Sequence, residues 1–441
     1  MILSALDMLV PTHQTSGLWR HPEAVTEEYR DLDFWVSHVK LLEEAGFDTV
    51  FFADVAGVYD VYEGSGRTAI RTGMQYPLLD PLLLISALAA ATEEIGFGVT
   101  ANVSYESPFL LARKFATLDH LTRGRIAWNI VTGYQPSALR NIGADSLPHD
   151  ERYDRADEYM EVVYALWEGS IEPGALRIDA AANTYLDPDR VHPINHRGKY
   201  FDVPGTAVTL PGPQRVPLLF QAGSSPRGMD FAARHAEVLF FAGTTPDNVR
   251  PLVDAAQGRA AAELSTITSV TLIAAGSDAA ARERYESYLR HVDPEAAMAL
   301  FAGWTGLDLS TYGPDDVLEE VHIEGNRSAL QSFTAMDPGR RWTIGDLASH
   351  MTIGGRGPVF VGSGETIVEE LERWMKEAGV DGFNVDYALR GPDMKAFAEH
   401  VTPVLRSRGL LRKRSGNTLR GRLHGRDLLP DTHPAATFRR G

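Results

Sequence analysis

Short apolar segments alternate with longer amphipathic segments along most of the chain, and this alternation is typical of a parallel α/β fold. Residues 32–45 show the helical pattern, because apolar side chains recur at helical spacing and Gly46 follows as a C-cap. Residues 48–53 (DTVFFA) are typical of a buried strand. Eight segments are expected to be strands: residues 2–10, 48–53, 95–100, 125–130, 217–222, 237–241, 268–274 and 382–385.

Helices are expected between these strands, at 32–45, from about Asp80 onward, and at 108–121, 150–167 and 365–377. Eight alternating strand–helix units most naturally close into a (β/α)8 TIM barrel, which we predict as a single domain over 1–441. An open doubly wound sheet is the alternative, but no G-x-G-x-x-G follows the first strand.

Three stretches interrupt the alternation and are expected to be insertions after the second, fourth and seventh strands. Residues 55–79 are rich in Gly and Tyr, and residues 169–216 are rich in Pro, Gly and Asn and are expected to contain a hairpin. Residues 291–355 mix short helical pieces with Gly and Pro, and we expect them to cross one face of the fold as a lid.

Composition is that of a globular protein, with 44% hydrophobic and 23% charged residues among 441. The absence of cysteine excludes thiol catalysis, thiolate-bound zinc and iron–sulfur clusters. The net charge of −17 argues against nucleic acid as a partner. A basic tail at 406–441 carries ten Lys or Arg and two acids, and we expect it to pack on the acidic body or on a partner subunit.

The first ten residues are apolar but contain Asp7 and lack a basic leader, so a cytoplasmic location is expected. The longest apolar stretch, residues 81–91, is far shorter than the roughly 20 residues that a membrane span requires, so no membrane association is expected.

In a barrel, chemistry lies at the carboxyl ends of the strands. Asp54, Thr100 and Asn129 stand at three such ends. After the fifth strand, Ser224 and Ser225 lie in a small-residue loop that enters a helix, so they either form a phosphate cradle or act as an ordinary N-cap.

His149 and Tyr153 stand four positions apart at the start of another expected helix. On a shared helix face they could donate hydrogen bonds to a phosphate, or Tyr153 could simply pack in the core.

Signatures of hydrolases and metalloenzymes are missing, because the chain has no G-x-S-x-G, no H-E-x-x-H and no P-loop lysine motif. His192 and His196 have a spacing of four, but Pro193 between them argues against a helical metal pair, and no metal site is expected. Polar strand ends without evident acid–base machinery suit an enzyme whose cofactor supplies the reactivity.

A long motif, SPFLLARKFATLDHLTRGR at 107–125, continues into WNIVT at 128–132. Shorter motifs are GLWR at 17–20, AGSSPRG at 222–228, FAARHAEVLF at 231–240 and DGFN at 381–384. Together these motifs resemble the bacterial luciferase-like superfamily, and most of all its branch of nitrilotriacetate monooxygenase, pristinamycin synthase and dibenzothiophene-sulfone monooxygenase. The resemblance spans roughly residues 1–423.

The resemblance implies a two-component monooxygenase on a TIM barrel. Such enzymes take reduced FMN from a separate NAD(P)H:flavin reductase, react it with O2 to a flavin hydroperoxide, and oxygenate a small organic substrate. Members are commonly oligomers, so a homodimer or homotetramer is expected.

Residue by residue, the resemblance assigns cofactor positions. It places Asp54 near the flavin ring, Thr100 at a strand tip and Asn129 near the ribityl chain and ring. Near the FMN phosphate it places the pair His149 and Tyr153 and the loop that contains Ser224 and Ser225.

Substrate contacts are expected from loops that rim the flavin face, and the candidates are Tyr59, Gln75 and, in the expected lid, His322. His13 is the candidate for donating a proton or steadying the peroxide. Rival functions are a deazaflavin-dependent oxidoreductase of the same superfamily, a non-catalytic flavin-binding barrel and a metal-dependent barrel hydrolase.

Overall fold

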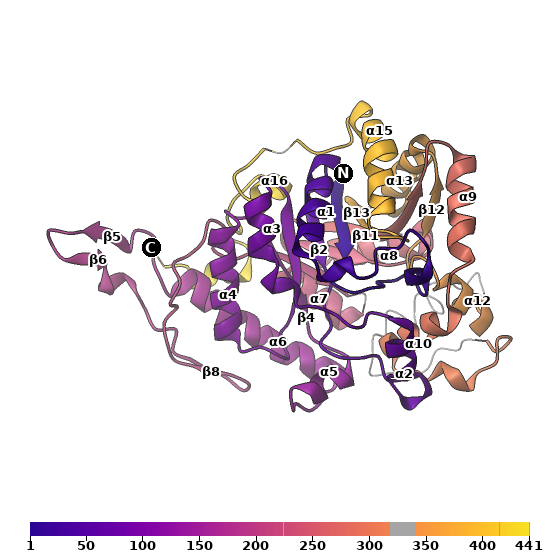
Figure 1. Cartoon of the computed structure of the whole chain (residues 1–441). Helices are drawn as coiled ribbons and strands as arrows, with labels where there is room; N and C mark the ends of the chain where they lie inside the picture. Colours follow the sequence, from indigo (N-terminus) through magenta and orange to yellow (C-terminus); the bar gives the residue numbers. More distant parts are fainter. Residues whose placement is uncertain (224, 318–340, 414, 441) are drawn as a thin grey trace.

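Eight parallel strands close into a barrel in the computed structural model, which describes residues 1–223, 225–317, 341–413 and 415–440 (Figure 1). The barrel strands, in order around it, are β1 (Ile2–Asp7), β2 (Thr49–Phe52), β3 (Gly96–Asn102), β4 (Ile126–Val131), β9 (Leu218–Ala222), β10 (Val238–Phe241), β11 (Ser265–Ala274) and β13 (Gly382–Asp386). The pairings β10–β11, β11–β13 and β13–β1 complete the ring. The predicted (β/α)8 barrel is therefore confirmed, and the open sheet is excluded.

Helices cover the outside of this ring, as the alternation along the chain predicts. Those that follow successive strands are α1 (Leu32–Ala45), α3 (Ile85–Ala91), α4 (Pro108–Leu121), α6 (His149–Tyr164), α7 (Pro226–His235), α8 (Pro246–Gln257) and α13 (Gly364–Ala378). The last barrel strand is followed by α14 (Pro392–Ala396), α15 (Thr402–Ser407) and α16 (Leu419–His424).

Local sequence explains the bounds of α1, which match the predicted range. The Asp31 side chain accepts a hydrogen bond from the Asp33 amide and so caps the amino end. Gly46 ends the helix with a φ of 93°, a left-handed conformation that glycine adopts without steric cost.

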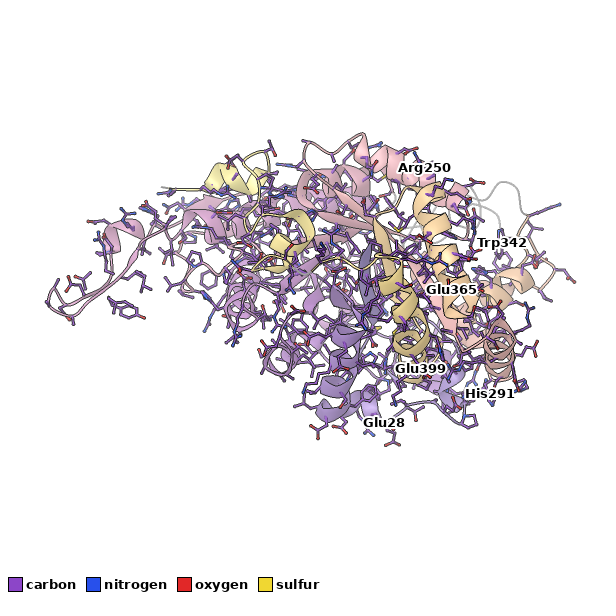
Figure 2. The ribbon with its side chains drawn as sticks, turned by 90° about the horizontal axis from the view of Figure 1, so that it is seen from above. Glu28, Arg250, His291, Trp342, Glu365 and Glu399 are labelled. Atoms are coloured by element: carbon purple, nitrogen blue, oxygen red, sulfur yellow. The ribbon has the colours of Figure 1, made fainter. Side chains whose placement is uncertain are left out.

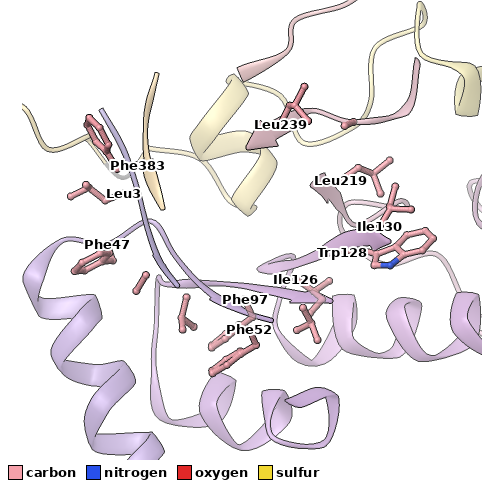
Figure 3. Packing of buried hydrophobic residues seen from close by; sticks show 14 of the residues in the cluster. Leu3, Phe47, Phe52, Phe97, Ile126, Trp128, Ile130, Leu219, Leu239 and Phe383 are labelled. Carbon is pink, nitrogen blue, oxygen red and sulfur yellow. The ribbon is translucent and has the colours of Figure 1, made fainter. Parts of the chain in front are cut away.

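The main core lies between the outer face of the barrel and the helices (Figure 3). Leu3, Phe97, Trp128 and Phe383 point outward from their strands into this layer. The alternate positions point inward, so that Leu6, Phe51 and Phe220 pack inside the barrel. These inward side chains fill the barrel below the carboxyl ends of its strands, so the space for a site is at those ends.

The three expected insertions contain secondary structure of their own. Residues 55–79 include α2 (Arg67–Thr72), and residues 291–355 include α10 (Pro294–Thr305) and α12 (Ile344–His350), while residues 318–340 lie outside the described part. Residues 169–216 hold two hairpins rather than one, β5–β6 (Leu176–Asp179, Thr184–Leu186) and β7–β8 (His196–Arg197, Asp202–Val203). The β5–β6 hairpin projects away from the barrel (Figures 1 and 2).

Two strand assignments differ from the sequence prediction. The first strand ends at Asp7 rather than Val10, because the chain turns away once the Asp7 carboxylate accepts the Met8 amide. An additional strand, β12 (Val359–Gly362), pairs with the far end of β11 outside the ring. Helix α9 (Asp278–Leu289) precedes the third insertion.

The basic tail packs on the acidic body of its own chain. The Arg420 side chain is fully buried, and its Nε lies 2.7 Å from Glu237 Oε1. Nearer the surface, Arg408 pairs with Glu365 of α13, which is labelled in Figure 2. The guanidinium of Arg439 approaches Glu168 to 3.2 Å. The tail thus contacts α13 on the outside of the barrel and also Glu237, which directly precedes β10.

Candidate functional site

A cavity of about 280 Å³ opens at the carboxyl end of the barrel strands. It brings together residues that are far apart in sequence and that were each singled out from it. These are His13, Asp54, Tyr59, Gln75, Thr100, Asn129, His149, Tyr153 and Ser225. Ser224 and His322 lie outside the described residues.

The floor of the cavity is polar where β3 and β4 end. Thr100 and Asn129 are register partners on these strands, and Asn129 Nδ2 donates a hydrogen bond to Thr100 Oγ1 at 2.9 Å. Within the described chain, Asn129 Oδ1 and the neighbouring Gln221 Oε1 are buried without a donor. Buried acceptors of this kind are normally satisfied, so both suit N–H or O–H groups of a bound molecule.

One end of the cavity is built by the first turns of α6 and α7. Ser225 caps α7 by accepting the Gly228 amide at 3.1 Å, so the capping hypothesis is confirmed for this serine. The same hydroxyl meets the phenol of Tyr153, which also bonds to the Thr132 side chain. A Cβ on Gly228 would come within 2.9 Å of the Tyr153 hydroxyl, so glycine there permits the close approach of α6 and α7.

His149 stands on the same helix face as Tyr153, with 5.3 Å between ring centroids, as their spacing predicts. Free N–H groups of a helix start, two hydroxyls and an imidazole make this end suited to an anion. Arg152, also at the cavity wall, adds positive charge.

Ion pairs hold α6 and α7 together behind this end. The Arg227 guanidinium lies 2.6 Å from Asp157 and 3.0 Å from Asp154, and His235 Nε2 lies 2.9 Å from Asp157. Burial alone would raise the pKa of Asp157, but its bonds to His235 and Arg227 outweigh burial and lower it. These ion pairs therefore join α6 and α7 directly behind this end of the cavity.

Asp54 carries the most perturbed carboxyl at the cavity. Burial, together with the charge of Asp80, raises its pKa to about 7. A carboxyl in this range exchanges a proton near neutral pH, which is a common property of functional sites.

The opposite end of the cavity is a hydrogen-bonded chain of side chains. Trp304 Nε1 donates to the Tyr59 hydroxyl at 3.2 Å, and that hydroxyl donates to Gln75 Oε1 at 3.0 Å. Gln75 Nε2 in turn donates to the backbone oxygen of His13 at 3.0 Å. The His13 ring is buried, with Nδ1 at 3.4 Å from Asp386 Oδ1.

A second buried network fixes the loop that carries His13. Asp7 accepts from Tyr387 at 2.7 Å and from Arg390 at 3.0 Å, and Arg390 also donates to the backbone oxygens of Met8 and Val10. Burial would raise the pKa of Asp7, but the Arg390 charge and the His38 hydrogen bond hold it well below its usual range. The loop after β1 is thereby locked against the end of β13.

Sequence reasoning missed five residues at this site: Tyr134, Arg152, Trp304, Arg356 and Asp386. Arg152 stands between His149 and Tyr153, and Tyr134 follows the WNIVT motif, so position near a motif could have found both. Asp386 follows the DGFN motif at the end of the last expected strand, so the same reasoning could have found it. Trp304 and Arg356 carry no such signal, because only the fold brings them to the cavity.

Other kinds of site receive no support from the described part of the chain. There, no group of three or more metal-ligating side chains gathers, and none of its helices is long and apolar enough to cross a membrane.

The fold and the site are those of a TIM-barrel enzyme with its cavity at the carboxyl ends of the strands. The model of the family described as luciferase-like monooxygenase matches residues 8–382. The chain belongs to this family, and it is a flavin-dependent monooxygenase of the two-component type, which uses reduced FMN and O2.

Similar proteins include the dimethyl-sulfide monooxygenase of Hyphomicrobium sulfonivorans, 44% identical over 100% of this chain and 94% of that protein. Its crystal structure superposes with a TM-score of 0.91, covering 100% of this chain and 96% of that one. The long-chain alkane monooxygenase of Geobacillus thermodenitrificans is 40% identical over 99% of this chain and 97% of that protein. A structure of a riboflavin lyase with modified FMN matches at 35% identity and a TM-score of 0.93 over 100% of both chains.

Proposed function

We propose that reduced FMN lies along this cavity, with its phosphate at the α6–α7 end and its ring toward His13. The observation that carries the proposal is the cavity itself, which joins an anion cradle, a floor with open acceptors and a buried histidine in one continuous space. The donor set fits FMN, because the cradle offers hydroxyls and helix N–H groups while the floor offers acceptors.

When bound, FMN supplies the activation of O2. The chain's own residues bind and orient it. Tyr153, Ser225, His149 and the start of α7 hold the phosphate, and Thr100 and Asn129 meet the ribityl chain or ring. Asp54, with its pKa near 7, stands at the ring and exchanges a proton there.

His13 serves the oxygen-transfer step. Its ring is buried beside the Asp386 carboxylate, which orients it as proton donor toward the cavity. Tyr59 and Gln75 line the substrate side, and Trp304 of α10 covers them. These three side chains form the wall of the cavity on the substrate side.

We also propose that the chain works with a separate NAD(P)H:flavin reductase and assembles as a homodimer or homotetramer. Light scattering at micromolar concentration tests the assembly, and a monomer would contradict it.

Stopped-flow absorbance tests the function. Protein loaded anaerobically with reduced FMN is mixed with oxygenated buffer. We expect a flavin species with an absorbance distinct from both reduced and oxidised FMN and a lifetime much longer than that of free flavin. Reoxidation at the rate of free flavin would refute the proposal and favour a non-catalytic barrel.

Equilibrium binding tests the orientation of FMN. Tyr153→Phe removes one hydrogen bond to a charged phosphate, so FMN affinity is expected to fall by about tenfold or more. Riboflavin, which lacks the phosphate, serves as the matched ligand, and its affinity is expected to stay unchanged. Equal losses for both ligands would place Tyr153 elsewhere on the flavin.

A further inference from the structure

A row of polar side chains crosses the inside of the barrel, beneath the cavity. Thr49, Ser4 and Asn384 are register partners in turn on the neighbouring strands β2, β1 and β13, and Ser269 of β11 is the next partner of Asn384. Neighbouring strands lie about 4.8 Å apart, so register partners that point to the same face have adjacent side chains. The four residues therefore form one continuous row.

All four side chains of the row point into the barrel. In each strand the residue that follows the row belongs to the outer core, and side chains alternate between the two faces of a strand. Leu3 and Phe383, which precede Ser4 and Asn384, point outward as well (Figure 3). The inward direction places the row among the side chains that fill the barrel.

The row climbs from the amino end of the barrel to the cavity. Thr49 is the first residue of β2, whereas Ser269 is the fifth residue of β11, and Ser269 lines the cavity. Asp386, which lies beside His13, stands two positions beyond Asn384 on the same face of β13. The row thus ends at the cavity floor, next to the Asp386 carboxylate.

The inner part of the row carries polar atoms that the described chain leaves unpaired. Thr49, Ser4 and Asn384 are fully buried, each with 0% of its surface exposed. The Thr49 and Ser4 hydroxyls and both amide atoms of Asn384 form no hydrogen bond to a described residue. An amide can donate two hydrogen bonds and accept two, and a hydroxyl can donate one and accept two. Buried groups of this kind are normally satisfied, because leaving them dry costs their solvation.

Water is the ligand that these atoms suit. A water molecule both donates and accepts, so it can join an amide to a hydroxyl, and buried waters typically make about three such bonds. The row offers donors and acceptors together, and it has no charged side chain that would select an ion. The neighbouring inward side chains, such as Leu6, Phe51 and Phe220, are apolar, which confines water to the row.

We propose that Thr49, Ser4 and Asn384 bind ordered internal water, and that this water exchanges with solvent through the cavity, past Ser269. At the amino end of the barrel, leucines of α16 belong to the inner core and close the opposite way out. The site extends the cavity floor into the barrel. FMN on that floor would trap the water, and this last step alone rests on the proposed function.

A crystal structure of the flavin-free protein tests the site itself. Ordered water is expected within hydrogen-bond distance of both Asn384 and Ser4. Direct hydrogen bonds between these two side chains, with no water joining them, would overturn the inference, and so would an ion in place of water.

Relaxation dispersion of oxygen-17 and deuterium in the solvent tests the exit, because it reports how many waters stay inside a protein and for how long. The residence time of the internal water is expected to lengthen severalfold when oxidised FMN saturates the protein. An unchanged residence time with FMN bound would refute an exit through the cavity.

Substitutions assign the water to the row. Asn384→Leu, which replaces the amide by an apolar group of similar size, is expected to remove its contribution to the dispersion. Thr402→Val is the matched control, since it removes a buried hydroxyl that donates to the Ala45 backbone oxygen outside the barrel, and it should change nothing. An unchanged dispersion in Asn384→Leu would overturn the inference.

Ser4→Ala serves as a second variant if Asn384→Leu does not fold. It removes one partner of the water and is expected to shorten the residence time, and an unchanged time would contradict the assignment. Failure of the proposed function is recognised separately. A chain that binds no FMN would refute that function, while the crystal structure and the flavin-free variants would still decide whether the row binds water.

Discussion

Replacing Asp54 with Asn is expected to stabilise the flavin-free protein, and to do so only above acidic pH. In the folded chain, burial and the charge of Asp80 raise the pKa of Asp54 from 3.8 to about 7. An asparagine has nearly the same shape but no proton to lose, so the penalty of ionising a carboxyl in the site disappears.

The size and sign of the effect follow from linkage. Between pH 3.8 and about 7 the unfolded chain releases the Asp54 proton while the folded chain keeps it, so wild-type stability falls as pH rises through this window. Each pH unit is worth about 1.4 kcal/mol, so the full penalty is about 4 kcal/mol above pH 7. At pH 5 it is less than half of that, and below pH 4 it vanishes.

Urea unfolding of wild type and Asp54→Asn at pH 5 and pH 8 measures the effect, and the comparison at each pH cancels the other titrating groups. The variant's advantage is expected to grow by about 2–3 kcal/mol between the two values. Asp80→Asn is the control, because it can keep the cap of the Leu82 amide while it removes the charge next to Asp54. It should lower the pKa of Asp54 in the folded chain and so shorten the pH range over which wild-type stability falls. An advantage that is the same at both pH values would refute the reasoning.

Two further predictions concern the tail and the histidine. Arg420→Met leaves Glu237 buried without its partner and is expected to cost about 3–5 kcal/mol in urea unfolding. Arg408→Met removes a pair in the same tail but at the surface, and it is expected to destabilise the protein far less. Similar losses for the two variants would contradict a special role for the buried Arg420–Glu237 pair. Asp386→Asn is expected to lower kcat at least about tenfold in steady-state assays while KM and FMN affinity stay unchanged, because Asp386 acts through the His13 ring. A change in KM alone would assign Asp386 to substrate binding.

Much of the fold could be predicted from periodicity, because a parallel barrel is built from local units whose strands and helices each carry their own pattern. Helix α1 matches its predicted range, and all eight barrel strands lie where apolar segments stand. Strand β12 escaped prediction, since it is a short strand that exists only by pairing with the far end of β11. The second hairpin escaped for the same reason, because its two-residue strands carry no pattern.

The candidate site likewise combines features that could be predicted from the sequence with features that could not. By itself, the sequence determined which residues stand at strand ends and helix starts, and this placed Asp54, Thr100, Asn129, Tyr153 and Ser225 at the cavity, because the barrel brings those ends to one face. Only the tertiary structure decided that Asp386 lies beside His13 and that Arg356 stands over Trp304. These contacts join segments separated by up to hundreds of residues, and their geometry depends on packing that no local pattern encodes. The raised pKa of Asp54 has the same origin, since burial is a property of the folded chain.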